Sequence, residues 1–250
     1  MTTGLVLSLL QLADDHLILG HRLSEWCGHA PMLEEDLAMP NIALDLIGQA
    51  RALYSYIGEI EGHRRDEDCI AFGRIEREYR NLLICEVPNG DFGRTMLRQF
   101  YFSCFMLLFW EQAQLSLDNI LAGIAAKAVK EARYHRRHCG EWVIRLGDGT
   151  EESSKRMISA CEYLEPYLGE LFETDALKSQ FGPNSIFPDR EALRTDWMDD
   201  VIEVLGTALL PKPDLTHAQS GGRDGRHTED MGHLLTQLQY MQRTFPNMTW

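Results

Sequence analysis

The chain has 250 residues, of which 44% are hydrophobic and 25% charged, and its formal net charge at pH 7 is −14. This composition is ordinary for a soluble globular protein, and the excess of acids argues against nucleic acid or an anionic membrane as the main partner. The longest apolar run, at 100–110, is too short to span a membrane. The start of the chain has no basic segment, and the six cysteines form no Cys-x-x-Cys pair. We therefore expect a cytoplasmic protein with reduced thiols.

Apolar residues recur at helical spacing through the first third of the chain. A heptad seam runs over Leu5–Trp26, with His16 as its only polar member. A second helix is expected over about Leu33–Ile60, with Pro40 tolerated near its start. A third helix is expected over Asp66–Cys85. The pattern so far predicts long helices joined by short turns.

The rest of the chain continues this helical pattern. Asp91 is a suitable N-cap for a helix with the run FYFSCFMLLFWE, which is apolar on all sides and should lie centrally, with Glu111 on its buried side. Ser116 or Asp118 opens the next helix, whose first seam residues are small enough for close helix approach. Further helices are expected over Thr150–Phe172, Asp189–Leu210 and Thr228–Thr244, separated by connections at 173–188 and 211–227. No run alternates convincingly with period two, so the sequence predicts one all-α domain over residues 1–250.

The segment KEARYHRRHCGEW at 130–142 resembles a metal-binding helix with altered spacing. In ferritin-like dinuclear carboxylate proteins, each half of a four-helix core supplies one Glu and one Glu-x-x-His pair. Here Glu131 is followed at i+3 by Tyr134, and the imidazole arrives at i+4 as His135. Residues three and four apart share a helix face, so Glu131 and His135 can still point the same way.

A complete dinuclear site of this plan needs about four carboxylates and two imidazoles. The chain offers acids on four helices but lacks both Glu-x-x-His pairs, and the second helix has Gly48 three residues after Asp45. Two interpretations stay open, a metal site with an unusual ligand set and a hydrogen-bonded cluster of buried polar groups, and the second is favoured. The positions of this vestigial metal site are Asp15, Asp45, Gly48, Glu111, Glu131, Tyr134 and His135.

Glycine-rich GGRDGRH at 221–227 does not follow a predicted strand, so a phosphate-binding loop of the known kinds is not expected. Its composition favours a flexible loop. The sequence also has no Gly-x-Ser-x-Gly motif and no plausible Cys/His pair for nucleophilic catalysis. We therefore assign no catalytic residue to this chain.

Five blocks of sequence together resemble a known family. They are EWCGHAP (25–31), DLAMPNIALDLIGQAR (36–51), KEARYH (130–135), GGRDGRHTE (221–229) and LQYMQR (238–243). They look like the PaaC family, the C subunits of bacterial ring-1,2-phenylacetyl-CoA epoxidase (phenylacetyl-CoA monooxygenase), and the resemblance extends essentially from end to end. It implies a ferritin-like four-helix-bundle core with additional helices, in a multisubunit oxygenase of phenylacetate breakdown.

The resemblance also implies partners and cofactors. In that assembly the catalytic A subunit, of related fold, carries a di-iron centre, further small subunits are present, and a reductase subunit passes electrons from NADPH through flavin and iron–sulfur centres. The C subunit supports the A subunit structurally, so no metal and no cofactor is expected in this chain. Gly48 and Tyr134, at the two expected histidine positions, agree with this. The alternative is a stand-alone di-iron or di-manganese oxygenase with an atypical ligand set.

Arginines recur every three residues along the expected third helix, at Arg74, Arg77 and Arg80, with Glu76 and Glu78 between them. One interpretation is a set of i,i+4 surface ion pairs. Another is a contact with a partner subunit. A third follows from the resemblance, because the phosphates of phenylacetyl-CoA suit arginine forks; phenylacetyl-CoA would then touch this chain only at its edge. This candidate rim comprises Arg77, Glu78, Tyr79, Arg80 and Asn81.

Overall fold

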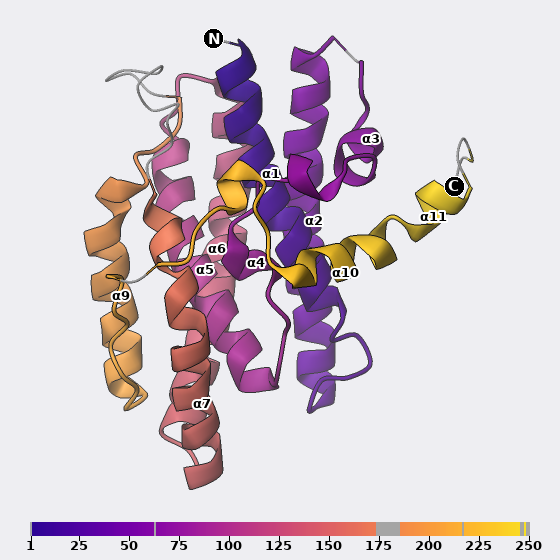
Figure 1. The fold of residues 1–250 in the computed structure, drawn as a ribbon. Coiled ribbons are helices and arrows are strands. Elements are labelled where there is room, and N and C mark those ends of the chain that lie inside the picture. The colour runs from indigo at the N-terminus through magenta and orange to yellow at the C-terminus, as the bar shows by residue number, and fades with distance from the viewer. Residues whose placement is uncertain (1, 63, 174–185, 217, 246–247, 249–250) are drawn as a thin grey trace. The chain divides into compact units, whose positions relative to one another are not determined.

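A computed structural model describes residues 2–62, 64–173, 186–216, 218–245 and 248 (Figure 1). Every regular element within these ranges is a helix, so the all-α prediction is confirmed. The chain forms two compact units from interleaved segments: unit 1 combines Met1–Cys27, Leu37–Pro88 and Ser220–Trp250, and unit 2 combines Gly28–Asp36 and Asn89–Gln219. That residues 1–250 form a single domain stays a prediction. None of the described helices is long and apolar enough to cross a membrane.

Unit 1 is built on two long helices, α1 (Thr2–Ser24) and most of α2 (Leu33–Ile60). They pack closely at Gly20, where an added Cβ would lie 2.9 Å from a side-chain carbon of Ile47 and 3.2 Å from the carbonyl oxygen of Ala43. The remaining elements of unit 1 are short: α3 (Glu67–Phe72), the 3₁₀ turn η1 (Glu76–Glu78), α4 (Leu83–Glu86), the 3₁₀ turn η6 (Gly222–Asp224), α10 (Glu229–Leu238) and α11 (Tyr240–Thr244).

The single helix predicted over Asp66–Cys85 is wrong. Asp66 does cap a helix, accepting a hydrogen bond from the amide of Cys69 at 2.7 Å, but α3 ends at Phe72 with Gly73 as its C-cap. The next residue, Arg74, turns back and donates from Nε to the carbonyl oxygen of Ile70 at 2.6 Å. A 3₁₀ turn, an extended stretch and one turn of α4 follow.

The helix predicted over Thr228–Thr244 is also interrupted. It divides into α10 and α11 at Gln239, which is buried. The side-chain amide of Gln239 donates to the carbonyl oxygen of Arg74 at 2.7 Å and contacts the hydroxyl of Tyr79 at 3.0 Å. A buried side-chain amide needs hydrogen-bond partners within the protein, and the amide nitrogen of Gln239 has them at the point where the helix is interrupted.

Unit 2 is organised by α5 (Phe92–Ala113) and α6 (Asn119–Gly147), which lie side by side in Figure 1. The predicted caps are confirmed, since Asp91, Asp118 and Thr150 each accept a hydrogen bond from an amide of the first helical turn. The helix predicted to reach Phe172 becomes 3₁₀ after Leu164, because Pro166 has no amide hydrogen to donate. The other elements among the described residues of unit 2 are α7 (Glu151–Leu164), η2 (Glu165–Tyr167), η3 (Gly169–Phe172), η5 (Glu191–Leu193) and α9 (Arg194–Thr207). Of the expected connection at 173–188, residues 174–185 lie outside the described part of the chain.

The core of unit 2 is formed around the apolar run of α5, as predicted. Phe100, Phe105 and Trp110 are each at most 1% exposed. The small seam residues Ala125, Ala128 and Ala132 of α6 are at most 3% exposed. Outside that seam, an added Cβ at Gly140 would lie 3.2 Å from the ring of Phe100. Trp197 of α9 completes the core, donating from its indole nitrogen to the carbonyl oxygen of Tyr101 at 3.0 Å.

Candidate site: buried carboxylates held by arginines

The first acid of α1, Asp14, is fully buried in unit 1. Its carboxylate accepts hydrogen bonds from both terminal nitrogens of Arg74 at 2.9 and 2.5 Å, from the hydroxyl of Tyr54 at 2.5 Å and from the amide of Arg80 at 2.7 Å. Burial and the Asp14 carboxylate both raise the pKa of Tyr54 well above its ordinary value, so the phenol keeps its proton. Every lone pair that a carboxylate offers in its plane is thus engaged by protein donors.

The cation of this pair, Arg74, is only 4% exposed and is held from several sides. Its terminal nitrogen also donates to the carbonyl oxygen of Glu78 at 3.0 Å, and its guanidinium lies 4.2 Å from the ring centroid of Tyr79. Burial by itself lowers the pKa of Arg74, but the charge of Asp14, the hydrogen bonds to its carboxylate and the neighbouring tyrosines together outweigh burial and raise the pKa. Arg74 therefore keeps its positive charge in the interior, where it is paired with the side chain of Asp14.

The second acid of α1, Asp15, is held in the same way by a different segment. Arg223 donates from both terminal nitrogens to its two carboxylate oxygens, at 3.0 and 2.8 Å, and the amide of Leu82 adds a bond of 2.7 Å. The same guanidinium also donates to the carbonyl oxygens of Gln11 at 3.0 Å and Arg80 at 2.7 Å. The GGRDGRH segment is therefore anchored to α1, in contrast to the flexible loop that its composition favours.

The two glycines on either side of Arg223 make this anchoring possible. Gly221 and Gly225 have φ values of +137° and +76°, which residues with a side chain rarely adopt. An added Cβ at Gly225 would also lie 2.3 Å from the carbonyl oxygen of Arg77. The position of these glycines around an arginine is the sequence feature from which an ordered segment could have been predicted. The glycine-rich composition alone does not indicate such order.

A third buried acid, Glu86 of α4, binds the end of the same segment. Its carboxylate contacts a ring nitrogen of His227 at 2.7 Å, and it accepts from the side chain of Asn81 at 2.8 Å and the amide of Thr228 at 2.6 Å. The other ring nitrogen of His227 lies 3.2 Å from the carbonyl oxygen of Tyr79. Because both nitrogens face acceptors, the geometry favours the doubly protonated ring.

In unit 2, the predicted acids of α5 and α6 pair with neighbouring cations. Glu111 is exposed, not buried as predicted, and Arg133 of α6 donates to it at 2.9 Å. Glu111 follows the buried Cys104 by seven residues, but spacing within one helix cannot tell whether another element covers Glu111. Glu131 lies 3.4 Å from Lys127 in an i,i+4 ion pair.

The two ring residues of the predicted metal helix point to different surroundings. His135 is 1% exposed, whereas Tyr134 is 41% exposed and stacks on His138 with 5.7 Å between ring centroids. His138 in turn contacts the buried carboxylate of Glu35 at 2.9 Å. One imidazole–carboxylate contact, between His138 of α6 and Glu35 of α2, thus involves residues outside the predicted set.

Two comparisons with known proteins bear on this arrangement. The whole chain, residues 1–250, matches the model of the family described as phenylacetic acid catabolic protein. It is also 43% identical over 241 residues to the C subunit of the 1,2-phenylacetyl-CoA epoxidase of Escherichia coli (strain K12), and the match covers 96% of this chain and 97% of that protein. The chain belongs to the phenylacetic acid catabolic protein family. This confirms the resemblance seen in the five sequence blocks and the ferritin-like fold class.

The acids of this family member do not fit a dinuclear metal centre. The oxygens of Asp15 that would ligate a metal are already bound by a guanidinium. Asp45 and Gly48 lie on a partly exposed part of α2, where an added Cβ at Gly48 would meet nothing within 4 Å. Within the described ranges, no group of three or more His, Cys, Asp or Glu side chains is placed to hold a metal ion. That the chain binds no metal stays a prediction, which iron loading tests.

The proposed CoA rim of this family member is not a helical strip. Arg77 and Glu78 are exposed, but Tyr79 and Asn81 are buried, with Tyr79 donating its hydroxyl to the carbonyl oxygen of Ala71 at 2.6 Å. The guanidinium of Arg80 donates to the carbonyl oxygen of Arg77 at 2.7 Å. Arg77 and Glu78 are therefore the members of the set best placed to touch a partner or substrate.

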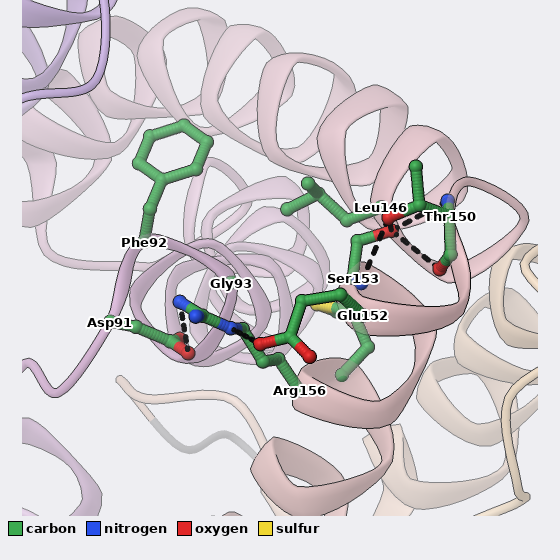
Figure 2. Close-up of a pocket in the computed structure, with 9 residues that line it drawn as sticks. Asp91, Phe92, Gly93, Leu146, Thr150, Glu152, Ser153 and Arg156 are labelled. Atoms are coloured by element: carbon green, nitrogen blue, oxygen red, sulfur yellow. Dashed lines mark hydrogen bonds and ion pairs between the residues drawn. The ribbon is translucent and has the colours of Figure 1, made fainter.

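Figure 2 shows a pocket of about 240 Å³ in unit 2 of this family member, which includes none of the predicted site residues. Its polar side chains mostly bind one another. Arg156 is 2.7 Å from Glu152, and the hydroxyls of Thr150 and Ser153 are 3.2 Å apart. The polar groups that line this pocket are thus engaged with one another.

The ion pair of His227 and Glu86 makes the stability of this family member depend on pH. Burial lowers the pKa of His227, but the hydrogen bond and charge of Glu86, together with the carbonyl of Tyr79 and the charge of Glu76, outweigh burial and raise the net pKa above 6.5. The pair's contribution is therefore complete below pH ~6.5, the unfolded value, and is lost as pH rises through the folded pKa. We expect the stability difference between wild type and His227→Gln to shrink from pH ~6.5 to ~9 in urea unfolding. A difference that grows over this range would contradict a charged His227.

Proposed function

We propose that the chain is the non-catalytic structural subunit of a multicomponent phenylacetyl-CoA 1,2-epoxidase of phenylacetate breakdown. The observation that carries the proposal is the 43% identity to the C subunit of such an epoxidase over nearly the full length of both proteins. In this role the chain packs against the di-iron catalytic A subunit and stabilises it. The cofactors of the reaction belong to other chains: di-iron to the A subunit, and NADPH, flavin and iron–sulfur centres to the reductase, all in the cytoplasm.

The chemistry of the buried acids supports a structural role. An oxygenase site needs carboxylates that are free to ligate metal, and each acid of α1 is instead bonded to an arginine. Carboxylate oxygens that are held by a guanidinium in this way are not free to bind a metal ion. The alternative, a stand-alone di-iron or di-manganese oxygenase, gains no support from these contacts.

Surface features of the chain are compatible with a partner subunit. Leu37 and Leu44 on one face of α2 are 60% and 65% exposed, and exposed leucines at helical spacing are typical of helix-packing surfaces. The exposed Arg77 and Glu78 remain a proposed contact with the A subunit or with the edge of phenylacetyl-CoA.

Co-expression tests the proposal directly. We expect the chain and the catalytic A subunit to elute as one complex that turns over phenylacetyl-CoA when the reductase and small subunits are supplied. Omitting this chain should reduce both the solubility of the A subunit and its turnover. Full solubility and full turnover of the A subunit without this chain would contradict the proposal.

A further inference from the structure

Unit 1 contains a cavity of about 340 Å³ between α1, α2 and α3 that the proposed function does not use. Its volume lies in the range of small-molecule sites, roughly 300–1,000 Å³. It shares only one side chain, Tyr54, with the carboxylate network of α1. The cavity is therefore a separate candidate site with its own chemistry.

The floor of the cavity is apolar. Leu17, Ile47, Ala71 and Phe72 line it, and Leu17 and Ala71 are 3% and 6% exposed. Tyr54 adds only its ring, because its hydroxyl is engaged with the Asp14 network. An apolar cavity of about 150 Å³ is enough to take up benzene. The floor therefore suits an aromatic ring or a large aliphatic group.

The rim carries charges of both signs with unused bonding capacity. Glu67 is occupied, since Arg51 donates from Nε to one of its oxygens at 2.7 Å and Ser55 donates to the other at 2.5 Å. The two terminal nitrogens of Arg51 and the carboxylate of Asp68 have no hydrogen-bond or ion-pair partner within the described residues. The rim can thus accept one anionic and one cationic group.

We propose that this cavity binds a small amphiphilic zwitterion, an α-amino acid with an aromatic or large aliphatic side chain. The carboxylate of the ligand lies on the guanidinium fork of Arg51 and its ammonium group on Asp68, while its side chain covers the apolar floor. A ligand with only one of the two charges leaves either Arg51 or Asp68 without a partner, which is the source of selectivity. The inference does not depend on the proposed epoxidase role.

Titration of the full-length chain with L-phenylalanine, followed by NMR or calorimetry, tests the proposal. We expect saturable binding with a dissociation constant on the order of 1 mM, as suits a ligand of this size. Phenylacetate and phenethylamine, which each lack one charge, should bind roughly tenfold more weakly. Arg51→Gln and Asp68→Asn should each weaken phenylalanine binding by a similar factor, and Ala71→Leu should abolish it by filling the floor.

The matched control is Arg226→Gln, an exposed arginine of the same unit outside the cavity, which should leave binding unchanged. Arg51 and Asp68 are exposed, so their variants should fold, and thermal unfolding verifies this. Absence of saturable phenylalanine binding to the wild type would overturn the proposal. Equal affinity for phenylacetate together with an unaffected Asp68→Asn variant would also overturn it, because the site would then recognise a simple aromatic acid.

Discussion

Replacing Arg74 with alanine should lower the free energy of unfolding by about 3–5 kcal/mol, the usual cost of leaving a buried charge without its partner. The orphaned group is Asp14, which is 0% exposed and would retain only Tyr54 and one backbone amide as donors. Urea unfolding of the purified chain, followed by circular dichroism, measures this change.

A surface pair provides the matched control for Arg74. Arg133 and Glu111 are 63% and 43% exposed and lie at a similar distance, 2.9 Å, so Arg133→Ala should cost at most about 1 kcal/mol. Replacing both members of the buried pair, Asp14→Leu with Arg74→Met, should recover much of the lost stability, because no buried charge is left. If Arg74→Ala costs no more than Arg133→Ala, the buried pair does not stabilise the fold.

Replacing Arg223 with alanine should release the segment at 221–228 from α1. Asp15 would lose both of its guanidinium bonds, and the segment would lose its anchor in the interior. We expect the amides of Arg226 and Thr228 to exchange their hydrogens roughly a hundredfold faster or more, which corresponds to a local opening at least about 2.8 kcal/mol easier.

The control for this second variant lies in the same segment. Arg226 pairs with Asp224 on the surface, where both side chains are more than 70% exposed, so Arg226→Ala should leave exchange at Thr228 nearly unchanged. Adding Asp15→Asn to Arg223→Ala should restore part of the stability by removing the unpaired charge. Unchanged exchange in Arg223→Ala would show that the segment is held by other contacts.

The long helices could be predicted from the sequence because their signals are local. Apolar spacing and the caps at Asp91, Asp118 and Thr150 depend on residues within a few positions of one another. The prediction of a single third helix over Asp66–Cys85 was wrong because the interruption depends on a distant residue. Arg74 turns inward to an acid 60 positions earlier, and no local pattern contains that information.

The candidate site was predictable only in part. The sequence has Gly48 and Tyr134 at the two expected histidine positions, and it favoured a hydrogen-bonded cluster of buried polar groups over a metal site. It did not identify the members of that cluster, because Asp15 meets Arg223 across 208 positions and Glu86 meets His227 across 141. Glu111 and Tyr134 were assigned from spacing within one helix, which does not tell which neighbouring element covers them.

The iron content of the purified chain tests the central claim most directly. The chain is incubated aerobically with excess ferrous iron and desalted, and the catalytic A subunit is treated in parallel as a positive control. Because arginines occupy the acids of α1, we expect no stoichiometric iron in this chain, while the A subunit retains its di-iron centre. One or two equivalents of tightly held iron per chain would contradict the account and favour an oxygenase with a site of its own.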